Sequence, residues 1–184
     1  MLTVNRLAGL IDALDSAPWG ASTGRSHRHA RPAPAPLYTP EQRARRDASR
    51  WTLVQGILAP VQFLVFLVSL GLVLTYLASG EGFGLATGSV VLKTLVLYVI
   101  MVTGAVWEKV VFGQYLFAPA FYWEDMFSML VLGLHTLYLG AVFGGLGSPE
   151  AQMFLALAAY AAYVVNAAQF VLKLRAARLE SPGR

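Results

Sequence analysis

Acidic side chains flank the most aromatic segment of the chain, and they are the residues best suited to proton transfer. Glu108 lies before this segment, while Glu124 and Asp125 follow it. Two carboxyl groups held together where water is scarce tend to share one proton, so that one acts as an acid while the other stays negatively charged. We expect Glu108 and Glu124 to form such a pair. Asp125 points about 100° away from Glu124 around a helix, and we expect it to pair with Lys109.

Other polar residues interrupt stretches that are otherwise apolar. His135 follows Glu124 by eleven residues, almost three helical turns, so the two share a helix face. Gln62, Asn166 and Gln169 lie in two further apolar stretches. Polar groups are costly in lipid unless they face partners or water, so these residues predict a shared inner chamber that opens towards the cytoplasm. The simpler alternative is that inward amides, or a neutral histidine, only bond neighbouring helices.

The aromatic segment has a distinct composition. Seven aromatic residues lie among the seventeen from Trp107 to Trp123, and Tyr122 is one of them. Such residues either line a site for a flat ligand or form the aromatic belt at a membrane surface. Both interpretations stay open at this point.

The elements that position these residues are four apolar spans. The chain has 184 residues, of which 57% are apolar and 13% charged, whereas soluble domains carry roughly a quarter charged residues. This excludes a water-soluble globule. Stretches over about 52–78, 86–107, 124–145 and 151–172 are each long enough to cross a bilayer, which takes about 20 residues. The sequence therefore predicts an all-α, polytopic membrane protein with a bundle of four transmembrane helices.

Charge predicts the orientation and the domain limits. Basic residues gather before the first span and after the fourth, so the positive-inside rule places both termini in the cytoplasm. We expect a linker arm with a short interfacial helix over 1–38, a membrane domain over 39–180 and a tail over 181–184. Thr39, Pro40 and Gln42 form the pattern of a helix start. The basic ends do not indicate a nucleic-acid partner, because they lack a basic stripe with interleaved aromatics.

Several kinds of chemistry are excluded or unsupported. The chain has no cysteine, which excludes disulfides, thiolate nucleophiles and cysteine-bound metals. His27 and His29 lie in the arm, so His135 stands alone and no metal-ligand spacing is present. No nucleotide fingerprint occurs either.

A small multidrug-type transporter also has four spans, and it carries an acidic residue in the first of them. The first span of this chain carries only Gln and Ser at such positions, which argues against that class.

Three longer strings resemble a known family. They run over 51–63, 106–135 and 163–173, and include Val106-Trp-Glu-Lys-Val-Val-Phe-Gly-Gln-Tyr-Leu-Phe-Ala-Pro-Ala-Phe-Tyr-Trp-Glu-Asp-Met. Over about 37–179 the chain resembles 3-vinyl bacteriochlorophyllide hydratase. The resemblance implies a hydro-lyase of bacteriochlorophyll biosynthesis that adds water to the C3 vinyl group of chlorophyllide a or 3-vinyl bacteriochlorophyllide, giving the 3-(1-hydroxyethyl) product. It implies no cofactor beyond the Mg of the substrate, and a place in the inner membrane of a phototrophic bacterium.

With that chemistry in view, each candidate residue has an expected role. Catalytic roles fall to Glu124 and Glu108 as the acid pair, with Asp125 nearby, while His135 binds the substrate's Mg axially or relays a proton. Substrate contacts are expected from Gln62, Asn166 and Gln169, which orient water or ring substituents, and from Trp107, Tyr122 and Trp123, which flank the macrocycle. The expected partners are the Mg-tetrapyrrole, membrane lipid and other enzymes of the pathway. A non-catalytic pigment carrier or assembly protein is the alternative.

Overall fold

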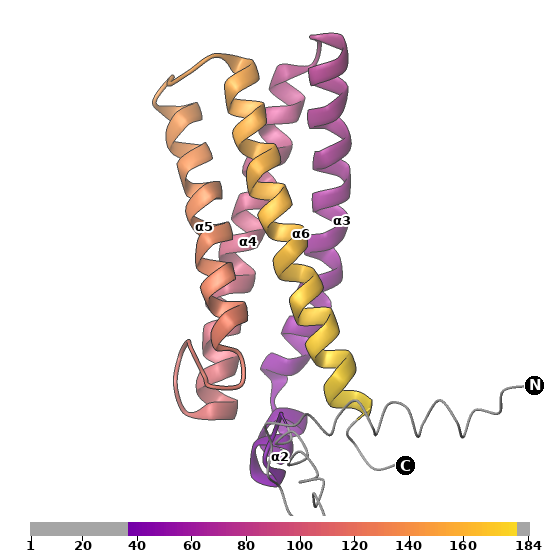
Figure 1. The fold of residues 1–184 in the computed structure, drawn as a ribbon, viewed down its shortest axis with the longest axis vertical. Coiled ribbons are helices and arrows are strands. Elements are labelled where there is room, and N and C mark those ends of the chain that lie inside the picture. Colours follow the sequence, from indigo (N-terminus) through magenta and orange to yellow (C-terminus); the bar gives the residue numbers. More distant parts are fainter. Residues whose placement is uncertain (1–36, 180–184) are drawn as a thin grey trace, which may run out of the picture. The chain divides into compact units, whose positions relative to one another are not determined.

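The computed structural model describes residues 37–179, which form helices and connectors without a strand. A short helix, α2 (Pro40–Ala48), precedes four long ones: α3 (Arg50–Ser79), α4 (Phe83–Phe112), α5 (Tyr122–Phe143) and α6 (Pro149–Leu179). The long helices lie side by side and alternate in direction (Figure 1). The predicted arm helix and the C-terminal tail lie outside the described residues.

The four long helices correspond to the four predicted spans. Their membrane-compatible lengths are 30, 30, 22 and 29 residues, and each exceeds the roughly 20 residues that a bilayer core needs. Large apolar side chains such as Leu64, Val68 and Leu130 are exposed on the outside of the bundle, as expected of a surface that faces lipid. The prediction of an all-α protein with four spans is confirmed, while the side of the membrane on which the termini lie stays a prediction.

The first described helix begins where the sequence predicts. The Thr39 hydroxyl accepts a hydrogen bond from the Gln42 amide at 3.2 Å, and the Gln42 side chain accepts one from the Thr39 amide at 2.9 Å. This reciprocal capping box satisfies two amides that lack partners at a helix start, and Pro40 occupies the first turn, where its missing N–H does no harm. Ser49 then ends α2 and caps α3 through the Trp51 amide.

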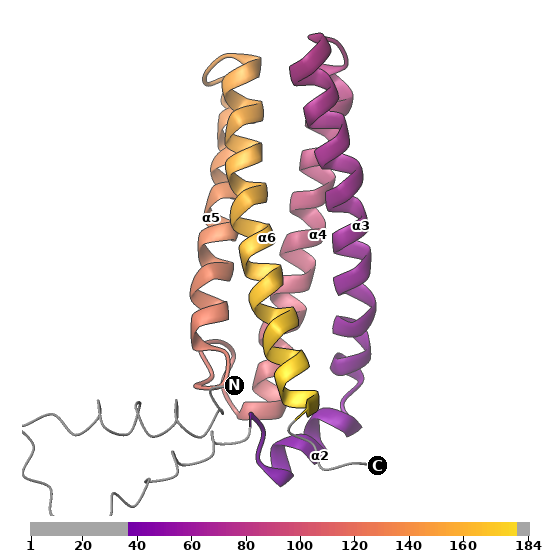
Figure 2. The ribbon, with the colours of Figure 1, turned by 45° about the vertical axis from the view of Figure 1, so that its right-hand side comes forward.

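The long helices pack as two hairpins. α3 packs mainly on α4 and α5 mainly on α6, with fewer contacts between the pairs; Figure 2 shows these pairs edge-on. The hairpins meet through polar and aromatic contacts. The Phe66 ring lies 5.4 Å from Tyr160 and 5.0 Å from Tyr163, and the Ser69 and Tyr160 hydroxyls form a 2.6 Å hydrogen bond. Polar contacts also occur within each hairpin, as between Gln55 and Thr103 on α3 and α4 and between Asn166 and Ser128 on α6 and α5.

The two ends of the bundle differ. At one end, which we call the connector end, a nine-residue connector (113–121) joins α4 to α5, and α2 lies against α4 there (Figure 2). Gly113 ends α4 with φ of +89°, a conformation that glycine adopts without the clash a Cβ would cause. At the opposite, far end, short turns join α3 to α4 and α5 to α6.

Candidate active site

A pair of buried carboxyl groups joins the two hairpins at the connector end. Glu108 on α4 and Asp125 on α5 are 5% and 3% exposed, and their carboxyl groups lie close enough to interact with each other. Two ionised carboxylates would repel each other there, whereas a proton on one of them allows it to donate a hydrogen bond to the other. The pair is therefore suited to share one proton in a site shielded from water. The expected pairing of Glu108 with Glu124 was wrong, because Asp125 takes that position.

The backbone of the connector holds both members of this pair. The Phe117 amide donates to Asp125 Oδ2 at 2.7 Å, and the next amide, that of Ala118, donates to Glu108 Oε2 at 3.3 Å. Phe117 has φ of +59°, a left-handed conformation that costs a non-glycine residue about 1–2 kcal/mol. Strain of this kind persists where surrounding contacts enforce it. Two consecutive amides thus fix the orientation of the carboxyl groups and stabilise negative charge on them.

Glu124 has a different partner. Its carboxylate accepts a 2.6 Å hydrogen bond from Lys173 Nζ on α6. α5 packs against both α4 and α6, and adjacent helical residues point about 100° apart, so Glu124 faces α6 while Asp125 faces α4. The expected pairing of Asp125 with Lys109 was also wrong: Lys109 Nζ turns back to the Gly113 carbonyl at 2.7 Å, at the end of its own helix.

A second buried polar layer lies closer to the far end. His135 is fully buried; its Nδ1 donates to the Val131 carbonyl at 2.8 Å, which leaves Nε2 as a free acceptor without a partner. Lys93 is also fully buried, and its Nζ lies 3.9 Å from the centre of the Tyr163 ring. Ten residues of α5 separate Asp125 from His135, which corresponds to about 15 Å along the helix. The candidate residues therefore lie in two layers at different depths, and the expected shared chamber stays a prediction.

Polar side chains without partners lie between these layers. Within residues 37–179, both amide atoms of the buried Gln62 lack a hydrogen bond, as do Asn166 Oδ1 and Gln169 Oε1. The amide nitrogen of Asn166 donates to Ser128 Oγ at 2.9 Å. On α6, Asn166 and Gln169 lie between Tyr163 and Lys173. Tyr163 faces Lys93 in the second layer, which we call the upper layer, and Lys173 pairs with Glu124 in the lower layer. Buried polar atoms nearly always have a hydrogen-bond partner in the protein, water or a ligand. A ligand or water between the two layers could therefore supply the partners that these atoms lack.

The predicted aromatic contacts divide into two groups. Trp107 is partly buried: its Nε1 donates to Thr52 Oγ1 at 3.0 Å, and its ring packs edge-on against Phe121 at 5.7 Å. Tyr122 and Trp123 are 45% and 68% exposed and face outward. The structure therefore brings Trp107 into the packed core at the connector end, but it places the other two on the surface that faces lipid or headgroups.

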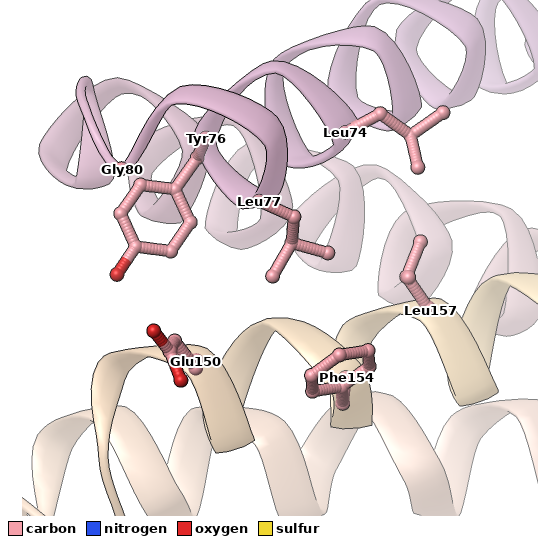
Figure 3. Close-up of a pocket in the computed structure, with 7 residues that line it drawn as sticks. All are labelled: Leu74, Tyr76, Leu77, Gly80, Glu150, Phe154 and Leu157. Carbon is pink, nitrogen blue, oxygen red and sulfur yellow. The ribbon is translucent and has the colours of Figure 1, made fainter.

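Two hollows on the described part of the chain lie elsewhere. The larger, about 510 Å³, separates the far ends of α3 and α6 (Figure 3), where the hydroxyl of Tyr76 and the carboxylate of Glu150 face each other. The rest of its lining is mostly apolar, and comprises Leu74, Leu77, Gly80, Phe154 and Leu157. The second, about 290 Å³, is a shallow groove on α4. Neither hollow is lined by the carboxyl pair or by His135.

Sequence reasoning left out two cations that the structure places in these layers. Lys173 was not assigned a role from the sequence, yet it forms an ion pair with Glu124. Lys93 was not assigned a role, although it is the one charged residue within the predicted span 86–107, and a charge in the middle of a span is a signal of function. Within residues 37–179 no cluster of three or more His, Asp or Glu is placed to hold a metal ion.

The described residues define a class: a multi-pass helical membrane protein with a buried carboxyl pair suited to share one proton. A family model described as 2-vinyl bacteriochlorophyllide hydratase matches residues 38–176, so the chain belongs to that family. A relative from Cereibacter sphaeroides with this name is 70% identical over 145 residues, which are 78% of this chain and 89% of the relative. Another from Rhodobacter capsulatus is 65% identical over 151 residues, 82% and 87% respectively.

The family is the one that the sequence resembles. The two names differ only in the number given to the vinyl position, 2 here and 3 in the resemblance. No solved structure matches the chain.

Proposed function

We propose that this protein adds water to the vinyl group of a bacteriochlorophyllide to give the hydroxyethyl product. The observation that carries the proposal is its 70% and 65% identity to two proteins named 2-vinyl bacteriochlorophyllide hydratase. The buried Glu108–Asp125 pair is consistent with it, because hydration of an alkene needs a proton donor and a group that accepts a proton afterwards. The substrate is a flat Mg-tetrapyrrole, and the sequence resemblance favours chlorophyllide a or its 3-vinyl bacterial counterpart.

The shared proton of the carboxyl pair starts the reaction in this mechanism. It passes to the terminal vinyl carbon as the double bond breaks, leaving a cation on the inner carbon. Conjugation with the macrocycle and the negative charge left on Glu108 and Asp125 stabilise that cation. Water then forms a bond to the inner carbon and gives its extra proton back to the pair. Atoms and charge balance without oxidation or reduction, so the reaction requires no redox cofactor.

We infer that the macrocycle lies between the hairpins, along the path from the carboxyl pair to the upper polar layer. The free Nε2 of His135 suits an axial bond to the substrate's Mg, since neutral imidazole nitrogen is a common metal ligand. Gln62, Asn166 and Gln169 present unpartnered amide atoms along this path, where they orient water or ring substituents. The interface between the hairpins, which has fewer contacts than either hairpin has within itself, opens to admit the pigment.

The aromatic residues take two roles in this arrangement. Trp107, packed beside Phe121, borders the pigment at the connector end. Tyr122 and Trp123 face outward, so they contact the pigment as it enters from the lipid rather than inside the bundle. The basic residues around α2 place that end on the cytoplasmic side by the positive-inside rule, in the inner membrane of a phototrophic bacterium, where other enzymes of the pathway can pass the pigment on.

A product assay tests the function directly. The purified protein in lipid nanodiscs is incubated with chlorophyllide a, and the pigments are analysed by mass spectrometry for a gain of one water at the vinyl group. We expect this product with the wild type and with Glu81→Gln, a matched control that removes a carboxylate from the exposed turn at the far end. Pigment binding without product, under every condition tried, would favour the carrier alternative.

A further inference from the structure

Lys93 is a buried cation that lacks an acidic partner. Its side chain is fully buried, and its Nζ has no hydrogen-bond partner among residues 37–179. The ion pairs in that range are Arg46–Asp47 and Lys173–Glu124, and the remaining buried acids, Glu108 and Asp125, lie close to each other in the lower layer. The ammonium group of a lysine has three N–H donors. At this buried position Lys93 has, among the described residues, neither a negative charge nor a hydrogen-bond acceptor beside it, which is unfavourable.

The groups around Lys93 stabilise its charge only in part. The Tyr163 ring centre lies 3.9 Å from Nζ and that of Tyr160 lies 5.7 Å away. Aromatic faces attract an ammonium group, but they accept no conventional hydrogen bond. His135 lies beside the same Tyr160 ring, 5.9 Å between ring centres, and its Nδ1 donates to the Val131 carbonyl. The layer thus positions an ammonium group against aromatic rings and leaves its hydrogen bonds for an anion.

We propose that Lys93 binds the free carboxylate of the substrate's propionate side chain. This inference rests on the proposed function, because the names of the relatives specify a bacteriochlorophyllide, and the ending denotes a pigment whose acid side chain is not esterified. A hydrogen bond between an ammonium group and a carboxylate is among the strong ones in a protein. The ligand therefore supplies both the counter-charge and the acceptors that the protein does not.

The spacing of the layers fits this assignment. Tyr163, which faces Lys93, and Lys173, which pairs with Glu124, are ten residues apart on α6, or about 15 Å along the helix. In a chlorophyllide the vinyl group and the acid side chain lie on neighbouring pyrrole rings. A pigment that places its vinyl group at Glu108 and Asp125 extends towards the layer that holds both His135 and Lys93.

The consequence is selectivity for unesterified pigment. Lys93 makes the protein discriminate the acid from its ester, so hydration must come before the reaction that esterifies the acid side chain. The charge also fixes the direction in which the macrocycle enters, because a pigment inserted the other way round would leave its carboxylate beside the Glu108–Asp125 pair. Like charges at that separation repel each other strongly in an apolar medium.

A comparison of acid and ester pigments tests the proposal without requiring turnover. Dissociation constants are measured by quenching of protein fluorescence, using chlorophyllide a and its propionate methyl ester. The proteins are the wild type, Lys93→Met, Lys93→Arg and the control Lys109→Met, whose lysine is exposed and lies on the same helix. We expect the wild type and the control to bind the acid about 10- to 100-fold more tightly than the ester. Lys93→Met should bind both equally, and Lys93→Arg should keep part of the preference.

Two results would overturn the assignment: a wild type that binds acid and ester equally, or a Lys93→Met variant that keeps the full preference. If Lys93→Met fails to fold, judged by helical circular dichroism and a monodisperse elution profile, the wild-type preference and its reduction in Lys93→Arg decide the matter. The proposed function can fail separately. A wild type that forms no hydroxyethyl product yet loses its acid preference on Lys93→Met would refute the hydratase and retain the carboxylate site.

Discussion

Replacing one member of the carboxyl pair by its amide separates chemistry from structure. The Ala118 amide donates to Glu108 Oε2 at 3.3 Å in the wild type. In Glu108→Gln the side-chain amide oxygen can still accept this hydrogen bond, and the new NH₂ group can donate to Asp125. The hydrogen bonds of the site keep their number and direction, so we expect the free energy of unfolding to change by no more than about 1 kcal/mol. An amide cannot give up a proton to the vinyl carbon, however. We therefore expect the rate of hydration to fall by about 10²- to 10⁴-fold, the usual contribution of a positioned acid.

The assay measures initial rates of hydroxyethyl product together with thermal unfolding and pigment binding. Asp125→Asn should lose rate to a similar degree, because an amide cannot supply the proton. Its oxygen still accepts the hydrogen bond from the Phe117 amide, so the fold should be kept. The double variant should be little worse than either single one, since residues that act as a unit are not additive. Glu81→Gln serves as the control for removal of a carboxylate. An undiminished rate in a folded Glu108→Gln protein would refute the shared-proton mechanism.

Three further predictions concern stability. Lys173→Met leaves the 10% exposed Glu124 carboxylate unpaired, so chemical unfolding should show a loss of about 1–3 kcal/mol, less than for a fully buried pair because the lysine is partly exposed; adding Glu124→Gln should restore part of it, and no recovery would contradict the pairing. Gly113→Ala forces a side chain to φ +89° and should lower stability by about 1–2 kcal/mol, whereas Gly133→Ala, a helical site with open space, should not; equal thermal shifts would contradict this. Burial raises the pKa of Tyr38 above its ordinary value, so its stabilising contribution is present below that value and is lost as pH rises through the raised pKa; an ultraviolet titration that shows no late-ionising tyrosine, relative to Tyr38→Phe, would count against it.

The features predicted from sequence are those that depend on local chemistry. The four spans follow from hydropathy, because an apolar run of about 20 residues is stable as a helix that crosses the bilayer. The start of α2 follows from Thr39 and Gln42, whose side chains satisfy amides only a turn away. The burial of Gln62 and His135 follows from the high cost of polar groups in lipid. Each of these depends on the residue and its near neighbours along the chain.

The pairings were not predictable in the same way. Helical geometry placed Glu124 and Asp125 about 100° apart, but it did not say which of them faces α4 and which faces α6. That depends on the order in which the helices surround α5, which no local pattern encodes. The separation of His135 from Asp125 follows from the sequence, because ten residues of one helix correspond to a rise of about 15 Å. Lys93 was visible as a lone charge, but its lack of an acidic partner depends on the tertiary structure.

The connector orients the acid pair through two backbone amides, those of Phe117 and Ala118, and not through a side chain. An alanine scan across residues 113–121 would therefore overlook these contacts, because each alanine variant still carries its N–H. Proline is the informative replacement, since it alone removes that donor. Ala118→Pro would take away the amide that contacts Glu108 while leaving every acidic residue in the sequence intact.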